Sequence, residues 1–534
     1  MRLIGHADAL STSNDEWITD SVRESCVVDT PNAPFVCLGT SVGDANARVQ
    51  QFERQVDKVN EVYGLIGGLL DPAVELALGR VCAGVGKVAH LLRTAGTDLP
   101  DKACAYFDNA QGEFIDRTLA GDLGDSAHQQ AGLGVQAGGL GMRRAVDLRC
   151  IAATASRVEA RPFVAKLFRD MDQRGFGLPG CLARFDAALN ADVAALVDAL
   201  PNDVTAAVRD AIEMAGVHAQ ERFEALANGR RPRDGSGPPV GSQHAGDHLL
   251  PAFGVEDPEH PTSVSPRLQH KLSKILDETV AERLCDEAAS AGRRCDAIRL
   301  RDLADPSVNH EYLWLMGDAP TGGLSGDDFI IDVRLRLGAS QCDDSRLCGS
   351  CQRSRLDVQA NHAQCCAPGP SNSGHNDVRD SLFDLVRIAD STAETEALGL
   401  LCTAPSLRPA DILTSAVPGS ALHALDVTVV APLAHGAGDD PCAAAVRRKL
   451  SRYRAFFPEL SAGGVRYVPL AWTYWGREGD AAAAMIVILA RRAARRRGFA
   501  SSAGLLRRAR CSIGLALANR RAAMVRACLA NCSR

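Results

Sequence analysis

Ala424-Leu425-Asp426-Val427-Thr428-Val429-Val430 is the stretch that decides the fold of the C-terminal part of the chain. A short apolar run that is rich in β-branched residues predicts a strand buried on both faces of a sheet. Helices are expected on either side of it, at about 378–390 and 441–456, and a second strand is expected at Val465 to Leu470. Two long helices follow. The pattern therefore predicts a small α/β unit.

Polar residues around this strand have the chemistry of a hydrolytic metal site. Asp411 follows a turn and Asp426 lies in the first half of the strand, so the two carboxylates can converge on a divalent ion. Their hard oxygens suit magnesium, which orients an attacking water and offsets charge on a scissile phosphate. Thr428 stands where a lysine would complete an Asp-x-Lys pattern, and Lys449 on the next helix is the expected substitute. The competing interpretation is that Asp411 caps a turn and Asp426 is a strand-edge residue.

Four soft or borderline metal ligands precede this unit at the paired spacing of a tetrahedral zinc site. They are Cys348, Cys351, His362 and Cys366. The surrounding segment, 342–374, has little periodicity and many turn formers, which is typical of a segment that metal orders. Cys365 and His375 are alternatives for the fourth ligand. A scatter of reduced cysteines that bind nothing is the competing interpretation.

Charge is unevenly distributed along the chain. The net charge is −6, but residues 441–534 contain 19 basic and 3 acidic residues, which gives a local +16 and leaves −22 on the preceding 440. Such a block is typical of a surface that binds a polyanion, and a solvated arginine-rich helix face is the alternative. The arginines expected to contact phosphates recur at helical spacings of three and four. They are Arg491, Arg492, Arg495, Arg496, Arg507 and Arg508.

The preceding part of the chain has a helical pattern. Apolar residues recur at three and four from about 45 to 93, which predicts two amphipathic helices broken near Asp71-Pro72. Further helices are expected at 101–120, 142–172, 180–200, 203–228, 266–289 and 294–304. A stretch rich in Gly, Pro and charged residues predicts a linker at 229–265. The expected fold class is a mainly α N-terminal region, a small zinc module and a C-terminal α/β domain.

Two further motifs have plain structural explanations. Gly326-Asp327-Asp328 lacks a partner aspartate in a separate strand, so it is interpreted as a helix N-terminus and not as a polymerase site. Trp472, Tyr474 and Trp475 could stack on an unpaired base, but aromatic residues after a strand are more often core residues.

The eighteen cysteines are interpreted as reduced thiols or metal ligands. Met1 to Leu10 contains no apolar signal core, and the apolar run Ala481 to Ala490 is too short to cross a bilayer. A protein of the cytosol or nucleus, without membrane association, is therefore expected.

Together these residues resemble the C-terminal part of polyproteins from non-LTR retrotransposons that carry a restriction-like endonuclease. In that family a reverse transcriptase is followed by a Cys-Cys-His-Cys knuckle and a PD-(D/E)XK-type nuclease. The similar stretches are Cys348 to Cys366, His375-Asn376-Asp377-Val378-Arg379-Asp380, Arg408-Pro409-Ala410-Asp411, Leu425 to Val429 and Lys449-Leu450-Ser451-Arg452-Tyr453. The resemblance implies nuclease roles for Asp411, Asp426 and Lys449, with Tyr453 nearby. Ala410, inserted between Pro409 and Asp411, departs from the family's pattern.

The N-terminal half resembles the thumb region of the same family. Phe35-Val36-Cys37-Leu38-Gly39 is similar to the primer-grip strand after the polymerase palm. Cys82 to Gly84, Lys87 to Arg93 and Gly138 to Gly141 resemble the thumb and the region behind it. Residues 1–34 contain no Phe/Tyr-x-Asp-Asp strand, so the polymerase palm is expected to be missing and polymerase activity is not expected from this chain.

The resemblance thus implies an order of domains. They are a truncated start (1–34), a thumb-like helical region (35–228), a linker (229–265), a helical connector (266–340), a zinc knuckle (341–375) and a restriction-like nuclease with a basic helical tail (376–534). The implied function is magnesium-dependent nicking of DNA by a retroelement fragment that also has RNA as a candidate partner. The alternative is a zinc-dependent nucleic-acid-binding remnant without catalysis.

Overall fold

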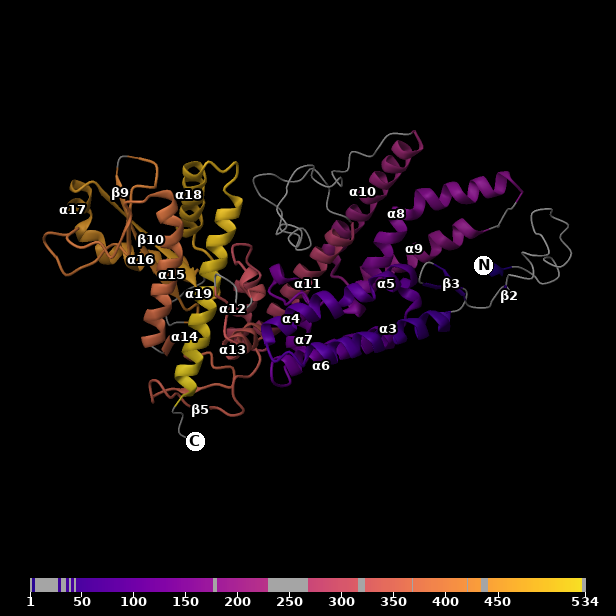
Figure 1. Cartoon of the computed structure of the whole chain (residues 1–534), viewed down its shortest axis with the longest axis horizontal. Coiled ribbons are helices and arrows are strands. Elements are labelled where there is room, and N and C mark those ends of the chain that lie inside the picture. Colours follow the sequence, from indigo (N-terminus) through magenta and orange to yellow (C-terminus); the bar gives the residue numbers. More distant parts are fainter. Residues whose placement is uncertain are drawn as a thin grey trace.

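The computed structural model is mainly helical, with a small mixed sheet in its C-terminal part (Figure 1). The structure describes residues 2–4, 27–29, 35–37, 40–42, 45–175, 180–228, 268–315, 322–366, 368–419, 421–433 and 440–530. The expected linker at 229–265 and most of the expected truncated start at 1–34 lie outside the described residues.

Helices account for almost all of the described chain between residues 45 and 337. They are α3 (Ala45–Ile66), α4 (Pro72–Leu78), α5 (Ala89–Ala95), α6 (Asp101–Thr118), α7 (Asp125–Gly132), α8 (Ala145–Gln173), α9 (Cys181–Asp198), α10 (Asn202–Ala227), α11 (Leu268–Ser290), α12 (Arg294–Leu303) and α13 (Gly326–Leu337). The expected break lies at Asp71, whose carboxylate caps α4 by accepting from the amides of Ala73 and Val74 at 3.0 and 3.1 Å. In Figure 1 the helices α8, α9 and α10 extend away from the sheet.

Short elements complete this region. They are β1 (Arg2–Ile4), β2 (Val27–Asp29), β3 (Phe35–Cys37), β4 (Thr40–Val42), η1 (Gly79–Ala83), η2 (Val85–Lys87), η3 (Gly96–Asp98), η4 (Val135–Ala137) and η7 (Glu311–Trp314). β3 covers the first three residues of the strand expected at 35–39, of which 38 and 39 lie outside the described residues, and pairs antiparallel with β4.

The C-terminal sheet has four strands in the order β10-β9-β8-β7. β7 (Glu394–Thr395), β8 (Ile412–Thr414) and β9 (Leu422–Val430) form an antiparallel meander. The helix α16 (Pro441–Tyr453) then crosses over to β10 (Val465–Thr473), which is parallel to β9. The other helices are α14 (Ala363–Cys366), α15 (Pro368–Ala389), η8 (Arg454–Phe456), α17 (Phe457–Ala462), α18 (Asp480–Arg497) and α19 (Ala503–Leu529).

The two faces of this sheet are covered by different helices. Leu425 and Val427 of β9 point into a core formed with α15, α18 and α19. Ala424 and Val430 point the opposite way, into smaller cores that include residues of α16 and α17. Because side chains alternate along a strand, Asp426 lies on the α16 face. The stretch Ala424 to Val430 is therefore a buried strand with one carboxylate under α16.

Two sequence motifs have the structural roles expected for them. Asp327 and Asp328 lie in the first turn of α13, where the Ser325 hydroxyl accepts from the Asp328 amide. Trp472 and Trp475 are buried, like Tyr474 between them, so these aromatic rings belong to the core. None of the described helices has the length and apolar character needed to span a membrane.

Ion pairs between the helical region and the C-terminal domain account for part of the charge asymmetry. Four arginines of the basic block pair with acids between residues 302 and 332. The pairs are Arg477–Asp302 at 3.1 Å, Arg507–Glu311 at 2.6 Å, Arg521–Asp332 at 2.6 Å and Arg526–Asp328 at 3.1 Å. These four arginines of the basic block therefore neutralise acids of the helical region and are not available to a polyanion.

Candidate functional site

The predicted metal ligands lie together in a small module that precedes α15. A hairpin of β5 (Arg346–Leu347) and β6 (Arg355–Leu356) carries Cys348 and Cys351 in its turn. His362 and Cys366 come from the start and the end of α14. The four ligand atoms all lie within 4.8 Å of one another, so this cluster can hold a metal ion.

The spacing of the ligand atoms fits a tetrahedral ion. The Sγ atoms of Cys348 and Cys366 are 3.7 Å apart, and Cys351 Sγ is 3.4 Å from His362 Nε2. Zinc–sulfur and zinc–nitrogen bonds of ordinary length give tetrahedral edges of about 3.8 Å between two sulfurs and about 3.6 Å between sulfur and nitrogen.

The local electrostatics favour cation binding. Backbone N–H groups of Ser354 and Arg353 lower the pKa of the Cys351 thiol to about 5, so this ligand is already ionised near neutrality. Burial and the neighbouring cysteine sulfurs raise the pKa of Cys366 to about 11. A cation at the centre removes the repulsion between the thiolates that causes part of this rise.

The two alternative ligands lie outside the cluster. Cys365 is exposed, and His375 lies on α15, which begins at Pro368 and packs on the sheet. Residues 368–375, which the expected domain order places in the zinc knuckle, therefore belong to a helix of the C-terminal domain.

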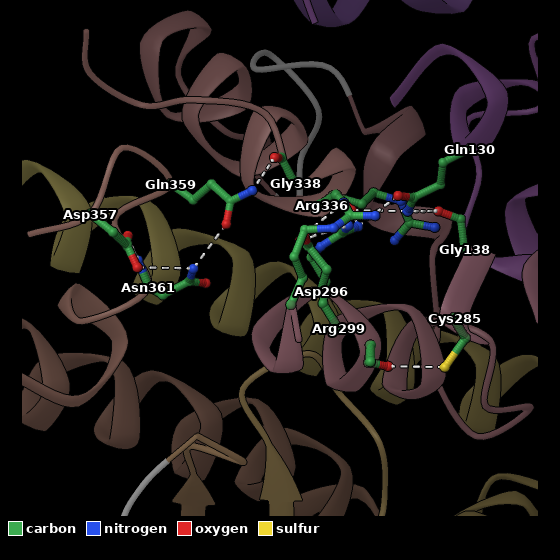
Figure 2. A network of polar contacts seen from close by, with 12 residues as sticks. Gln130, Gly138, Cys285, Asp296, Arg299, Arg336, Gly338, Asp357, Gln359 and Asn361 are labelled. Atoms are coloured by element: carbon green, nitrogen blue, oxygen red, sulfur yellow. Dashed lines mark hydrogen bonds and ion pairs between the residues drawn. The ribbon is translucent and has the colours of Figure 1, made fainter. Parts of the chain in front are cut away.

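Hydrogen bonds attach the metal module to both parts of the molecule. Figure 2 shows Gln359 donating to the carbonyl of Gly338 at the end of α13, at 2.9 Å, and Asn361 donating to the side-chain oxygen of Gln359, at 3.1 Å. On the other side, the Gly349 amide donates to the carbonyl of Cys528 on α19 at 2.8 Å. Gln364 donates to the carbonyl of Arg521 at 3.1 Å. The metal module is thus hydrogen-bonded to both α13 and α19, at the junction of these two helices.

On its α13 side, this junction adjoins a buried polar network, which Figure 2 also shows. Arg299 donates to the side-chain oxygen of Gln130 and to the backbone carbonyl of Arg336. Gln130 donates to the carbonyls of Gly138 and Arg336 at 3.0 and 2.9 Å. This network connects α7 and the loop after it with α12 and α13, so the metal module contacts a helix that is held by buried hydrogen bonds.

The two predicted catalytic aspartates lie side by side on neighbouring strands. Ile412 pairs with Leu425 in the antiparallel register of β8 and β9, so Asp411 comes opposite Asp426. The Asp411 amide donates to the Leu425 carbonyl at 2.9 Å, and its carboxylate accepts from the Val427 amide at 2.7 Å. The structure therefore brings the pair together although fourteen residues separate them in the chain.

Lys449 from α16 reaches the same point. Its Nζ donates to Oδ1 of Asp426 at 2.8 Å, while the hydroxyl of Tyr467 donates to Oδ2. Asp426 is only 4% exposed. Burial raises the pKa of this carboxyl above its ordinary value, although Lys449 opposes the rise.

Asp411 has the opposite electrostatic character. Burial would raise its pKa, but His375, the Val427 amide and Lys449 outweigh it and lower the pKa below its ordinary value. His375 Nε2 lies 3.6 Å from the Asp411 carboxylate. Two adjacent carboxyl groups whose pKa values are shifted in opposite directions are typical of sites that divide acid and base roles.

Tyr467 is the site residue that sequence reasoning missed. It lies on β10, and burial followed by the charge of Asp426 raises its pKa far above the ordinary value, so it remains a donor. Alternation along β10 could have placed it on the α16 face, but only once the parallel register with β9 was known.

Tyr453, the fourth predicted catalytic residue, lies beside the acidic pair. Its hydroxyl donates to the carbonyl of Arg408 at 3.3 Å, and its ring lies 4.9 Å from that of Tyr467 between centroids. Tyr453 therefore packs beside the site without a hydrogen bond to the Asp411 or Asp426 carboxylate in this structure.

Glu396 holds the segment that carries Asp411. It has a positive φ of 50° and donates its amide to the Asp411 carbonyl at 2.9 Å, and its carboxylate pairs with Arg379 and with Arg408.

The predicted phosphate-binding arginines are not all on one surface. Arg491, Arg492 and Arg495 are exposed on α18, and Arg496 donates to the Ser391 hydroxyl at 2.7 Å. Arg507 is paired with Glu311, and Arg508 is exposed on α19. Because α18 packs on the face of the sheet opposite α16, its arginines lie across the sheet from Asp426.

No protein-family model matches the chain, and no curated protein is similar enough to count as a match.

Proposed function

We propose that the C-terminal domain is a magnesium-dependent DNA-nicking endonuclease of a retroelement-derived protein. The observation that carries this proposal is the meeting of Asp411, Asp426 and Lys449 at one point from three different elements. Phosphodiester hydrolysis needs carboxylates for a divalent ion and a cation for the charge that develops on phosphate. The three side chains supply both.

The order of elements supports a restriction-like assignment. A helix (α15), an antiparallel three-stranded meander, a crossover helix (α16) and a parallel strand follow one another. Asp411 precedes the middle strand of the meander and Asp426 lies within its third strand. This order supports the resemblance proposed for Arg408-Pro409-Ala410-Asp411 and Asp426, with Ala410 as the departure from the family's pattern.

The carboxylates of Asp411 and Asp426 can bind magnesium if water and substrate phosphate supply the remaining ligands. The acidic pair offers hard carboxylate oxygens, and among the described residues the only group of three or more suitable ligands is the cysteine–histidine cluster. Magnesium commonly keeps several waters and uses one or two carboxylates with substrate phosphate. When bound, the ion would lower the pKa of an attacking water. Asp411 and Asp426 would hold it, and Lys449 would offset charge on the phosphate.

The cysteine–histidine cluster is proposed as a structural zinc site. Four protein ligands at tetrahedral spacing leave no open position for substrate, as in structural zinc sites. Its contacts with α13 and α19 support a role in ordering the joint between the two parts of the chain.

A second candidate is a nucleic-acid-binding remnant without catalysis. The observation that favours it is the state of Asp426, which is almost fully buried and already bonded on both oxygens by Lys449 and Tyr467. Hydrolysis requires Lys449 to leave Asp426 for the phosphate when the ion binds. In the remnant this ion pair is only structural.

Nicking of supercoiled plasmid at increasing magnesium concentration tests the proposal. We expect nicking by the wild type, and its loss in Asp411→Asn and Asp426→Asn. Asp384→Asn is the matched control, because Asp384 is an exposed carboxylate on α15 that is not part of the acidic pair. A wild type that binds DNA without nicking it at any magnesium concentration supports the remnant. Nicking that survives Asp426→Asn refutes the assignment.

A further inference from the structure

The outer face of α16 is a row of arginines beside the acidic pair. Arg447, Arg448 and Arg452 are exposed, and the helix contains no acidic residue between Pro441 and Tyr453. Arg448 and Arg452 are four residues apart and therefore one above the other, about 6 Å apart along the axis. Lys449, between them in sequence, turns inward to Asp426.

These guanidinium groups differ from the arginines of the basic block that are already neutralised. Arg477, Arg507, Arg510 and Arg521 each pair with a carboxylate. In the described part of the chain no carboxylate forms an ion pair with Arg447, Arg448 or Arg452, and Arg452 lies only over the ring of Tyr453, at 5.5 Å. Their charge is thus available to an external anion.

The location of α16 distinguishes it from α18. α16 packs on the face of the sheet that carries Asp426, whereas α18 packs on the opposite face. A phosphate backbone that reaches Asp426 must approach beside α16. A backbone held by the arginines of α18 would be separated from the acidic pair by the thickness of the sheet.

We propose that the arginine face of α16, defined by Arg447, Arg448 and Arg452, binds the phosphate backbone of duplex DNA and guides it to the acidic pair. This deepens the proposed function and rests on it for the identity of the bound polymer. Each guanidinium presents a fork of donors to phosphate oxygens and carries no sequence information. The contact is therefore with the backbone of any duplex, and its strength depends on salt.

The test compares two triple variants of equal charge in the full-length protein. Arg447→Gln/Arg448→Gln/Arg452→Gln removes the α16 face. Its counterpart removes three exposed arginines of α18, by the changes R492Q, R495Q and R497Q. Fluorescence anisotropy with a labelled 30-base-pair duplex, without added magnesium, gives the binding constant at several salt concentrations. Thermal melting shows that both variants are folded.

We expect the α16 variant to bind about tenfold or more weakly at 100 mM salt, and its log–log salt slope to fall by about 2.7 for three lost phosphate contacts. The α18 variant should change the slope by less than about 1. An equal loss in both variants, a loss only in the α18 variant, or no binding by the wild type overturns the proposal.

The binding test and the nicking test fail separately. Wild-type protein that binds duplex DNA through α16 but never nicks it contradicts the proposed nuclease function and still supports the proposed DNA-binding role of α16. If the α16 variant nicks plasmid with an unchanged KM, the proposed DNA-binding role of α16 is contradicted and the proposed nuclease function is still supported. A single-stranded RNA of the same length, bound more tightly than the duplex, overturns the choice of partner.

Discussion

The buried ion pair between Asp332 on α13 and Arg521 on α19 is the contact whose loss we expect to cost most. The two side chains are 0% and 1% exposed, and Nε of Arg521 lies 2.6 Å from Oδ1 of Asp332. Arg521 also donates to the Tyr474 carbonyl at 2.5 Å and to the Tyr312 hydroxyl at 3.1 Å. That hydroxyl donates to the second oxygen of Asp332 at 3.0 Å.

Removing one partner leaves the other charge buried. We expect Asp332→Leu to lower the free energy of unfolding by about 3–5 kcal/mol, because the guanidinium then has only neutral acceptors. Arg521→Met should cost a similar amount, since Asp332 keeps a single donor. The double variant removes both charges, and we expect it to lose only about 0–2 kcal/mol. Part of that loss is the cation–π contact of Arg521 with Trp475, whose centroid is 4.9 Å away.

Urea unfolding, followed by circular dichroism and by tryptophan fluorescence, measures the four corners of this double-mutant cycle. Asp170→Asn is the control, because Asp170 forms an exposed ion pair with Lys166 within α8 at 2.6 Å. Such a pair is screened by solvent, and no measurable shift is expected. Additive losses in the double variant, or single losses under about 1 kcal/mol, would refute the reasoning.

Three shorter predictions concern metal, stability and pH. Cys366→Ser should abolish stoichiometric zinc in elemental analysis and lower the melting temperature, whereas Cys365→Ser should change neither, because only Cys366 lies in the cluster. Asp390→Ala should cost about 2–4 kcal/mol in urea unfolding, since its carboxylate accepts from three hydroxyls and two amides. Burial opposes these bonds, but they hold the Asp390 pKa below its ordinary 3.8, so the wild type should lose this stability as pH falls below that value. In a pH–rate profile of nicking, the acid limb should lie at a pH above the ordinary aspartate pKa, because burial raises the pKa of Asp426. Tyr467→Phe should move that limb to higher pH, because the hydrogen bond from Tyr467 lowers the Asp426 pKa.

The helices and the longest strand could be predicted because their signals are local. Asp71-Pro72 marked the start of α4, and the apolar run containing Asp426 marked β9. β7 and β8 are two and three residues long, too short to show any period, so the meander could not be predicted. The expected helix at 378–390 begins ten residues earlier, since its first turns contain Pro and Gly that argue against a helix.

The metal ligands could be predicted because they lie within nineteen residues and follow a paired spacing. The acidic pair depends on a strand pairing, and it emerged from a family resemblance and not from spacing. His375 was an ambiguous residue for the same reason, since only the packing of α15 on the sheet brings it to Asp411. The partners of Arg507 and Arg521 lie about two hundred residues away, so no local pattern could separate structural arginines from free ones.

The position of α19 in the chain has a consequence for how the molecule is made. This helix packs against α13, α14 and α15 and follows all of them in sequence. Chains fold from the N-terminus as they leave the ribosome, so Glu311, Asp328 and Asp332 emerge long before their arginine partners. During that interval the helical region carries uncompensated acids, and the cysteine-rich module can contact α13 but not α19. Joining the two halves is thus a late event in biosynthesis, when residues 503–529 have emerged.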